Sequence, residues 1–215
     1  MAPNRLGEIS VTQSKLIIAE GRDVGDFCRA ALKAYGVGGF QIINAGGVSQ
    51  IPPVIMALPM ITGFEQARVN GIAIVRDAEA VADSAVDSVR NALRKADLPV
   101  PDVAFQTAQE GGIKTAIAIL PGLDKNGKLI PSGSLEDLCL ATVDDEAVLT
   151  CVDAFLDCCE AAGCDLRRRH KAKLHAYLAS NDKFVGMSIG LASKANAWDW
   201  KHPQLDVFRE LLCNL

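Results

Sequence analysis

Two short stretches decide the expected fold of this chain: LIIAEGRDVGDF at residues 16–27 and GIAIVRDAEA at residues 71–80. In each, a short apolar run rich in strand-forming residues ends in acidic residues and leads into an amphipathic segment. A short, continuous apolar run bounded in this way is typical of a buried strand, and apolar residues at helical spacing follow it. Both stretches therefore predict a strand that passes directly into a helix.

Strand-like runs and helical segments continue to alternate in the rest of the first half. FQIIN at residues 40–44 and TAIAIL at residues 115–120 have the same buried-strand character. Apolar residues recur at helical spacing at residues 23–35, 53–60 and 81–93. Strands that alternate with helices predict a parallel sheet covered by helices on both faces.

The pattern changes after residue 134, where helix follows helix. Four helical segments are expected there, at residues 135–140, 145–162, 166–179 and 204–212. The two halves are joined without a low-complexity linker, and no internal repeat is visible. We therefore expect one domain over residues 1–215, with a sheet-bearing core at about residues 14–143 and C-terminal helices at residues 144–215 packed on it.

The composition indicates a globular protein without a general affinity for nucleic acid. Hydrophobic residues make up 49% and charged residues 22% of the 215 residues, which excludes a disordered chain. The formal net charge of -4 gives no basic field over the whole molecule. Contact with DNA or RNA would therefore depend on a local basic patch or on bound metal ions.

Nothing in the sequence predicts a membrane segment or export. The N-terminus, MAPNRLGEIS, has no positive region followed by an apolar run, so no signal peptide is expected. The longest apolar stretch, at residues 51–64, is too short for a bilayer span and contains three prolines. The seven cysteines are odd in number and form no C-x-x-C pair, which favours a reduced, cytoplasmic location.

Four of the cysteines gather in the C-terminal half, at Cys151, Cys158, Cys159 and Cys164. We interpret them as small thiols buried along a helix, because free cysteine is among the most often buried residue types. A zinc site that includes His170 is the alternative, but the spacing does not match a zinc motif.

Acidic residues follow two of the predicted strands. Glu20 comes directly after the first strand, and Asp77 and Glu79 closely follow the third. In parallel α/β sheets, ligands gather at the carboxyl ends of the strands, so these side chains are expected to share one cleft. Three carboxylates in a small volume repel one another, and a divalent cation with oxygen ligands removes that conflict.

The same acids also have an ordinary structural interpretation. Acidic residues are common after strands, as turn residues and as N-caps of the next helix. Asp77 or Glu79 alone would fit that interpretation better. Glu20-Gly21 together with Asp77-Ala78-Glu79 favours a Mg²⁺ site.

At this point the sequence resembles a known family. A strand ending in Glu-Gly and a later strand ending in Asp-x-Asp/Glu are the two signatures of the Toprim fold, which topoisomerases, primases, small maturation RNases and overcoming-lysogenization-defect (OLD) nucleases share. Within that fold, the chain more closely resembles a group of small, stand-alone, uncharacterised bacterial Toprim-like proteins related to the OLD nucleases. The resemblance runs from about residue 16 to residue 203, and its segments are LIIAEGRDVGDF, NAGG, GIAIVRDAEA, AIAILPG, GSLEDLCL, KAKLHAYLAS and WDWKHP.

The resemblance implies a Toprim-like (Rossmann-like) parallel sheet with an extra C-terminal helical layer, and it implies roles for matching residues. Glu20 would act as a general acid/base or as a metal ligand, and Asp77 and Glu79 would hold Mg²⁺, which Mn²⁺ may replace. Glu136 would complete a second metal position. Two metals would stabilise the attacking and leaving oxygens of a phosphodiester.

One position departs from the family pattern. Related nucleases usually carry a further acid four residues after the Toprim glutamate, where this chain has Val24. Asp23 and Asp26 flank this position and are the available substitutes. The second metal site therefore depends on Glu136 and on these flanking acids.

The dense basic run RRRHK at residues 167–171, with Lys173 close behind, has two interpretations. Such runs are usually a solvated helix face. The functional alternative is a phosphate-contacting face, with Arg168 and Lys171 binding substrate together with Gly21. In that case Lys171 or Lys173 would act as the catalytic lysine of the related nucleases does.

Two functions therefore follow from the sequence. The first is a Mg²⁺-dependent Toprim nuclease, or a nuclease subunit, that cleaves DNA or RNA phosphodiesters. Because the related nucleases are often paired with an ABC-type ATPase, the resemblance implies such a partner. The alternative is a non-catalytic Toprim module that binds Mg²⁺ with a nucleotide or a partner protein, which Val24 and the low basicity favour.

Overall fold

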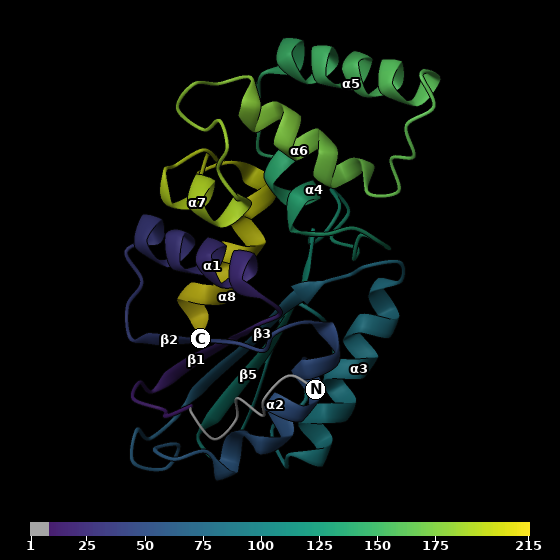
Figure 1. The fold of residues 1–215 in the computed structure, drawn as a ribbon. Coiled ribbons are helices and arrows are strands. Elements are labelled where there is room, and N and C mark those ends of the chain that lie inside the picture. Colours follow the sequence, from purple (N-terminus) through teal and green to yellow (C-terminus); the bar gives the residue numbers. More distant parts are fainter. Residues whose placement is uncertain (1–8) are drawn as a thin grey trace.

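The computed structural model of the chain describes residues 9–215. The N-terminal segment on which the signal-peptide expectation rests lies mostly outside the described residues. The described part is a mixed α/β structure of the Rossmann-like kind, with a five-stranded, mostly parallel central sheet flanked by helices (Figure 1).

The sheet has the strand order β2-β1-β3-β5-β4. Four strands run parallel and carry the buried apolar residues, and β4 pairs with β5 in the antiparallel direction. Their bounds are β1 (Lys15–Ala19), β2 (Phe40–Asn44), β3 (Gly71–Asp77), β4 (Thr107–Glu110) and β5 (Ile113–Leu120). All seven residues of β3 are buried, as expected for a strand covered on both faces.

Helices connect the parallel strands by crossovers. The first three are α1 (Arg22–Tyr35), α2 (Ile51–Ala57) and α3 (Ala82–Lys95). Since such crossovers are right-handed, α1 covers one face of the sheet, whereas α2 and α3, which pack against each other, cover the other face. Short 3-10 turns flank α2 at η2 (Val48–Gln50) and η3 (Leu58–Met60).

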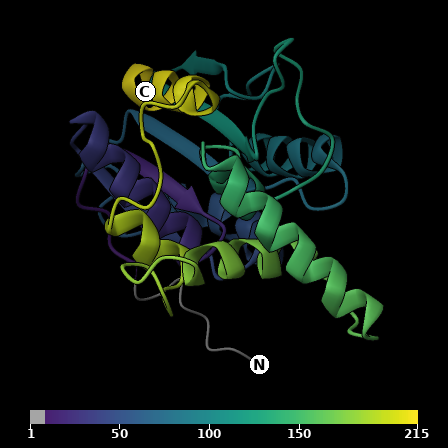
Figure 2. The same cartoon turned by 90° about the horizontal axis from the view of Figure 1, so that it is seen from above.

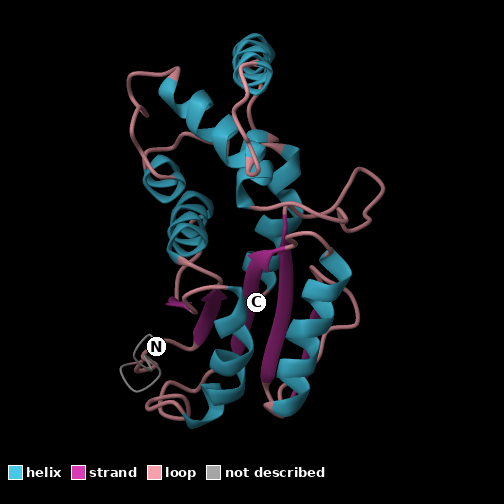
Figure 3. Cartoon of the chain, turned by 45° about the vertical axis from the view of Figure 1, so that its right-hand side comes forward, coloured by secondary structure: helices cyan, strands magenta, loops and turns pink. Residues whose placement is uncertain are grey.

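The remaining helices follow β5. They are α4 (Leu135–Leu140), α5 (Glu146–Ala161), α6 (Arg169–Ala179), α7 (Ile189–Lys194), the 3-10 turn η4 (Pro203–Leu205) and α8 (Asp206–Asn214). Helices α7 and α8 pack on α1, while α5 packs on α6 and α6 packs on α4. Figure 2 shows α5 extending past the rest of the molecule, and Figure 3 shows the helical region that continues beyond the strands.

The α/β alternation predicted from the sequence is confirmed, with three differences. The antiparallel strand β4 and the helix α7 were not predicted, and α6 begins at Arg169 rather than three residues earlier. Strand β4 has the polar sequence TAQE, which carries no apolar pattern. It pairs because the turn at Gly111 and Gly112 folds it back onto β5.

Among residues 9–215, no helix combines the length and the apolar character that crossing a bilayer requires.

Helix α7 is held against α1 at a very close approach. A Cβ atom built on Gly190 would lie 2.8 Å from Cβ of Asp26 and 2.9 Å from Oδ1 of Asp23. The backbone N–H of Gly190 donates to Asp23 Oδ1 at 3.1 Å, and Lys194 Nζ lies 2.8 Å from Asp26 Oδ2. A glycine at this position is therefore a requirement of the packing.

We expect Gly190→Ala to lower the free energy of unfolding by about 1–3 kcal/mol, because the added methyl group pushes α7 away from α1. Urea denaturation measures the change. Gly38→Ala is the matched control, since nothing lies within 4 Å of a Cβ atom there. Equal stability of the two variants would contradict the close packing.

Candidate metal centre

The acidic residues lie where the strand order reverses. From β1 the chain goes to β2 on one side, and it then crosses back to β3 on the other side of β1. In open α/β sheets the crevice at such a reversal, outside the carboxyl ends of the strands, is the usual ligand site. Glu20 follows the last residue of β1, and Asp77 is the last residue of the neighbouring β3.

The carboxylates of Glu20, Asp77 and Glu79 converge. One oxygen from each lies within 4.8 Å of the others. The backbone N–H of Asp77 donates to Oε2 of Glu20 at 3.1 Å, so the two strand ends are joined directly. The three acids that the sequence places after β1 and β3 thus lie at one place, close enough for one cation to draw their oxygens together.

Glu79 reaches the cluster through an unusual backbone conformation. Its φ of 57° is in the left-handed region, which few residues other than glycine adopt. Two hydrogen bonds of 2.9 Å hold it there, since Glu79 and Gly133 each donate a backbone N–H to the carbonyl of the other. Strained residues of this kind cluster at functional sites, where surrounding contacts fix them.

Asp77 is buried, with 9% of its surface exposed, and its side chain lies next to the first residue of α4. Its Oδ1 accepts the backbone N–H of Leu135 at 2.9 Å. Burial raises the pKa of Asp77 to about 8, and the nearby carboxylates of Glu20 and Glu136 act in the same direction. The hydrogen bond from Leu135 opposes the shift but does not cancel it. A carboxyl group in this position is stabilised in its ionised form by a cation.

The pKa of Glu20 is also raised. Burial is the main cause, and the charge of Glu79 adds to it, while the hydrogen bond from Asp77 and the positive charge of Arg76 act against it. The site therefore holds more negative charge than its own groups neutralise. Hard oxygen ligands with unbalanced negative charge are the donor set that Mg²⁺ prefers.

Glu136 lies in the first turn of α4, buried but outside the converging group of three. Its Oε1 is 3.1 Å from Nζ of Lys171 on α6. Burial alone would raise the pKa of Glu136, but hydrogen bonds from its own backbone, Ser134 and Lys171 outweigh that effect and lower it. Glu136 is thus an ionised carboxylate beside Asp77, paired with a lysine.

The side chains of the basic run at residues 167–173 point to two different sides of α6. Lys171 faces Glu136 and the acidic centre, whereas Lys173 Nζ lies 2.8 Å from Oδ2 of Asp153 on α5. Residues two apart on a helix point to different sides, so only one of these lysines reaches the centre. Arg169 also turns to α5, where it binds Asp157, and Arg168 is exposed at the N-cap of α6.

Asp23 and Asp26 do not replace the acid that is missing at Val24. Val24 is buried in the core, and Gly21 occupies the N-cap of α1 beside Glu20. Asp23 accepts the backbone N–H of Gly190, and Asp26 is paired with Arg29 at 2.6 Å and with Lys194. Both flanking acids therefore serve the contact between α1 and α7 and supply no ligand to the acidic centre.

The cysteine prediction was wrong. Cys151, Cys158 and Cys164 are exposed and Cys159 is partly exposed, because α5 contacts α6 along one side only. Among the described residues, these four cysteines and His170 do not form a group of three side chains close enough to hold a metal ion. The expectation failed because a helix at the edge of the fold buries only a narrow stripe, here Val152 and Leu156.

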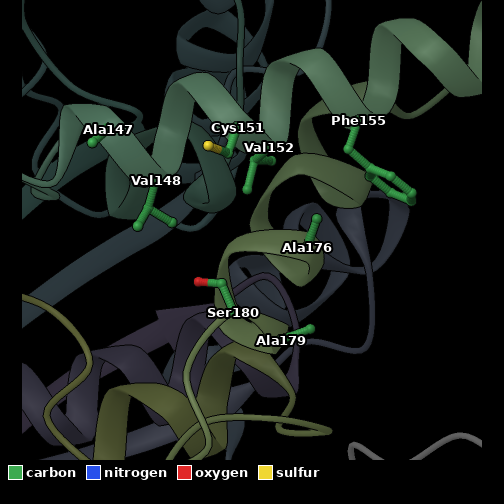
Figure 4. Close-up of a pocket in the computed structure, with 8 residues that line it drawn as sticks. All are labelled: Ala147, Val148, Cys151, Val152, Phe155, Ala176, Ala179 and Ser180. Atoms are coloured by element: carbon green, nitrogen blue, oxygen red, sulfur yellow. The ribbon is translucent and has the colours of Figure 1, made fainter.

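A separate groove of about 520 Å³ lies between α5 and α6. Its walls are almost entirely apolar, and Figure 4 shows Val148, Val152 and Phe155 on α5 facing Ala176 and Ala179 on α6. It contains no carboxylate, histidine or basic group, so it offers no acid–base or metal chemistry. The acidic centre is therefore the candidate site.

Sequence reasoning missed one charged residue at the centre, Arg76. It is buried, with 6% of its surface exposed, and its Nε donates to the carbonyl of Asp77 at 3.2 Å. Burial lowers its pKa, and Glu20, Glu79 and Asp77 counteract that effect. The signal was a charged residue inside the otherwise apolar strand GIAIVRD, which is costly unless opposite charges lie nearby.

Comparison with known proteins gives one match. The model of a family described as "Protein of unknown function (DUF3226)" matches residues 14–215. No curated protein and no solved structure matches the chain.

Proposed function

Since the chain belongs to the DUF3226 family, whose description assigns no activity, we propose a function from the site itself: Mg²⁺-dependent cleavage of nucleic-acid phosphodiesters. The observation that carries the proposal is the convergence of Glu20, Asp77 and Glu79 within 4.8 Å at the reversal point of the sheet. The order of these acids after β1 and β3 supports the resemblance to the Toprim nucleases, which is part of the proposal.

The residues fit a divalent cation. All three side chains offer carboxylate oxygens, and the raised pKa of Asp77 shows that the centre lacks positive charge. With the guanidinium of Arg76, three ionised carboxylates leave a formal charge that one divalent cation balances. When bound, Mg²⁺ or Mn²⁺ supplies positive charge that offsets the charge developing on phosphoryl oxygens.

The protein groups have distinct tasks in hydrolysis. One carboxylate oxygen of Glu20 would bind the cation, and the other would accept the proton of the attacking water as the water oxygen bonds to phosphorus. The bond from phosphorus to the leaving oxygen breaks, and that oxygen receives a proton from solvent. Asp77 and Glu79 would hold the cation, and Lys171 neutralises the negative charge of Glu136.

The two lysines of α6 provide a matched test of this arrangement. We expect Lys171→Met to lower the cleavage rate roughly tenfold or more, because Lys171 is the one lysine of residues 9–215 that is paired at the centre. Lys173→Met removes a similar side chain from the same helix, but its partner is Asp153 on α5. Initial rates on one DNA substrate should separate the variants, and equal loss in both would contradict the assignment of Lys171.

One observation favours a second candidate function. Asp23 and Asp26 are engaged with α7, so only Glu136 remains to build a second metal position. A single cation suits a non-catalytic module that binds Mg²⁺ with a nucleotide or a partner protein. Such a module would bind the cation through the same three acids and cleave nothing.

The decisive assay is cleavage of supercoiled DNA and of structured RNA with Mg²⁺ or Mn²⁺, comparing the wild type with Glu20→Gln and Asp77→Asn. The proposal expects cleavage by the wild type alone. Cleavage that survives both substitutions would refute the assigned centre. No cleavage by the wild type, together with tight Mg²⁺-dependent nucleotide binding, would establish the second candidate.

The proposal includes a partner and a location. An ABC-type ATPase partner follows from the resemblance, and it would supply the nucleic-acid affinity that a net charge of -4 does not provide. A cytoplasmic location is supported by the cysteines, all seven of which are free.

A further inference from the structure

A second hollow borders the acidic centre on the opposite face of the sheet. It has a volume of about 480 Å³ and lies between the η2–α2 segment and the start of α3. Its lining includes Arg76, Glu79 and the hydroxyl-bearing residues Ser49, Ser84 and Ser88. Because successive residues of a strand point to opposite faces, Arg76 enters this hollow while Asp77 faces α4. Glu79 borders both sites.

The guanidinium of Arg76 has unused donor capacity. Its side chain is more than nine-tenths buried, yet its one hydrogen bond within the described residues is from Nε to the carbonyl of Asp77. No carboxylate of residues 9–215 lies within ion-pair distance of it, and its terminal nitrogens are not among the fully buried polar atoms of the described residues that lack a partner. Because Arg76 lines the hollow, these nitrogens are available to a ligand there. The carboxylates of Glu20, Asp77 and Glu79 offset part of the cost of burying this charge, and a ligand in the hollow would complete its hydrogen bonds.

The chemistry of the walls indicates an anionic, oxygen-rich ligand. A guanidinium presents its donors in a fork that fits phosphate oxygens. Ser84 and Ser88 are one helical turn apart on α3, so their hydroxyls lie on the same side of the hollow. The helix also begins without a side-chain cap at Val81, which leaves its positive end available to an anion.

We infer that this hollow binds a phosphate ester group, with Arg76 as its anion-binding residue. The inference rests on the proposed function, since it extends the ligand of the acidic centre across the sheet edge. Glu79 would repel a phosphate unless a cation neutralises the three carboxylates. Binding of the ester is therefore expected to strengthen when a divalent cation is present.

The test measures two affinities in the full-length protein. A short fluorescent single-stranded oligonucleotide is titrated with Ca²⁺ in place of Mg²⁺, so that binding is measured without cleavage, and Mg²⁺ alone is titrated by calorimetry. The variants are Arg76→Gln, Arg76→Lys and, as a control, Arg94→Gln, which removes a charge from an exposed position on α3. A nucleoside 5′-monophosphate and the unphosphorylated nucleoside replace the oligonucleotide in parallel titrations.

We expect Arg76→Gln to weaken oligonucleotide binding about tenfold to a hundredfold, because a charge-assisted bidentate contact is lost. Mg²⁺ binding should be unchanged or tighter, since one positive charge near the carboxylates is gone. Arg76→Lys should retain part of the oligonucleotide affinity, and Arg94→Gln should retain all of it. An equal effect of Arg76→Gln on the monophosphate, with none on the nucleoside, would identify a free nucleotide as the source of the ester; an effect on the oligonucleotide alone would identify a polymer.

Two results would overturn the inference. Oligonucleotide affinity that does not change in Arg76→Gln would show that the guanidinium binds no anion. A parallel loss of Mg²⁺ and oligonucleotide binding in both Arg76 variants would show that Arg76 serves the structure alone. Failure of the proposed function gives a different result, because the wild type would then lack Mg²⁺ binding, and ester binding would be weaker but still dependent on Arg76.

Discussion

Asp77→Asn should abolish Mg²⁺ binding and at the same time stabilise the cation-free protein. The carboxylate of Asp77 is buried, and its pKa is raised to about 8, so keeping an acid there costs folding free energy at neutral pH. Asparagine has nearly the same shape and can still accept the backbone N–H of Leu135. A shift of about four pKa units corresponds to roughly 5 kcal/mol at pH 8. We expect the free energy of unfolding to rise by about 2–4 kcal/mol, because burying the amide of asparagine also costs free energy.

Urea denaturation with a chelator present measures the stability gain, and calorimetric titration with Mg²⁺ measures the loss of binding. Asp83→Asn is a suitable control, because Asp83 is an exposed acid on α3 outside the converging group. The opposite signs of the two effects distinguish a functional acid from a structural one. A destabilised Asp77→Asn variant would mean that the ionised carboxylate supports the fold, as an ordinary helix-capping residue does.

Cation affinity should rise steeply with pH up to about 8. In the cation-free protein Asp77 holds its proton until the pH passes about 8, and Mg²⁺ binds the ionised form. Affinity is therefore expected to fall about tenfold for each pH unit below that value and to level off above it. Between pH 8 and pH 6 the loss is roughly a hundredfold.

The stability of the cation-free protein should change in the opposite direction. Because the folded-state pKa of Asp77 lies above the unfolded value of 3.8, its contribution favours folding most at low pH. That contribution is lost as the pH rises through about 8.

Titrations with Mg²⁺ in buffers of different ionisation enthalpy count the protons released when the cation binds. Release of close to one proton at pH 7 is expected, and none would contradict the assignment of Asp77.

The sequence predicted the part of the fold that apolar patterning determines. Strands β1, β3 and β5 contain continuous apolar runs that are buried, which leaves little ambiguity about their type. Strand β2 is a shorter apolar run at the edge of the parallel strands, and only its Ile43 is buried. The polar strand β4 and the six-residue helix α7 escaped prediction because contacts distant in sequence stabilise them. For α7 these contacts include Gly190 against Asp23, which are far apart along the chain.

The acidic residues of the candidate site were also predictable from the sequence, but the basic residues around them were not. Glu20 and Asp77 follow neighbouring strands, so strand order alone brings them together. The direction of Lys171 and Lys173 was not predictable, because it depends on the rotation of α6 between α4 and α5. The role of Arg76 required the tertiary structure as well, since only the packing of α2 and α3 leaves the hollow that it enters.

We propose above that Glu20, Asp77 and Glu79 hold one divalent cation. A crystal soaked in Mn²⁺ above pH 8 tests it most directly, because the anomalous signal locates the metal without reference to activity. We predict one strong peak within bonding distance of a carboxylate oxygen from each of the three residues, at about 2.0–2.3 Å. A map with no peak among these carboxylates, in a crystal that binds Mn²⁺ elsewhere, would contradict it.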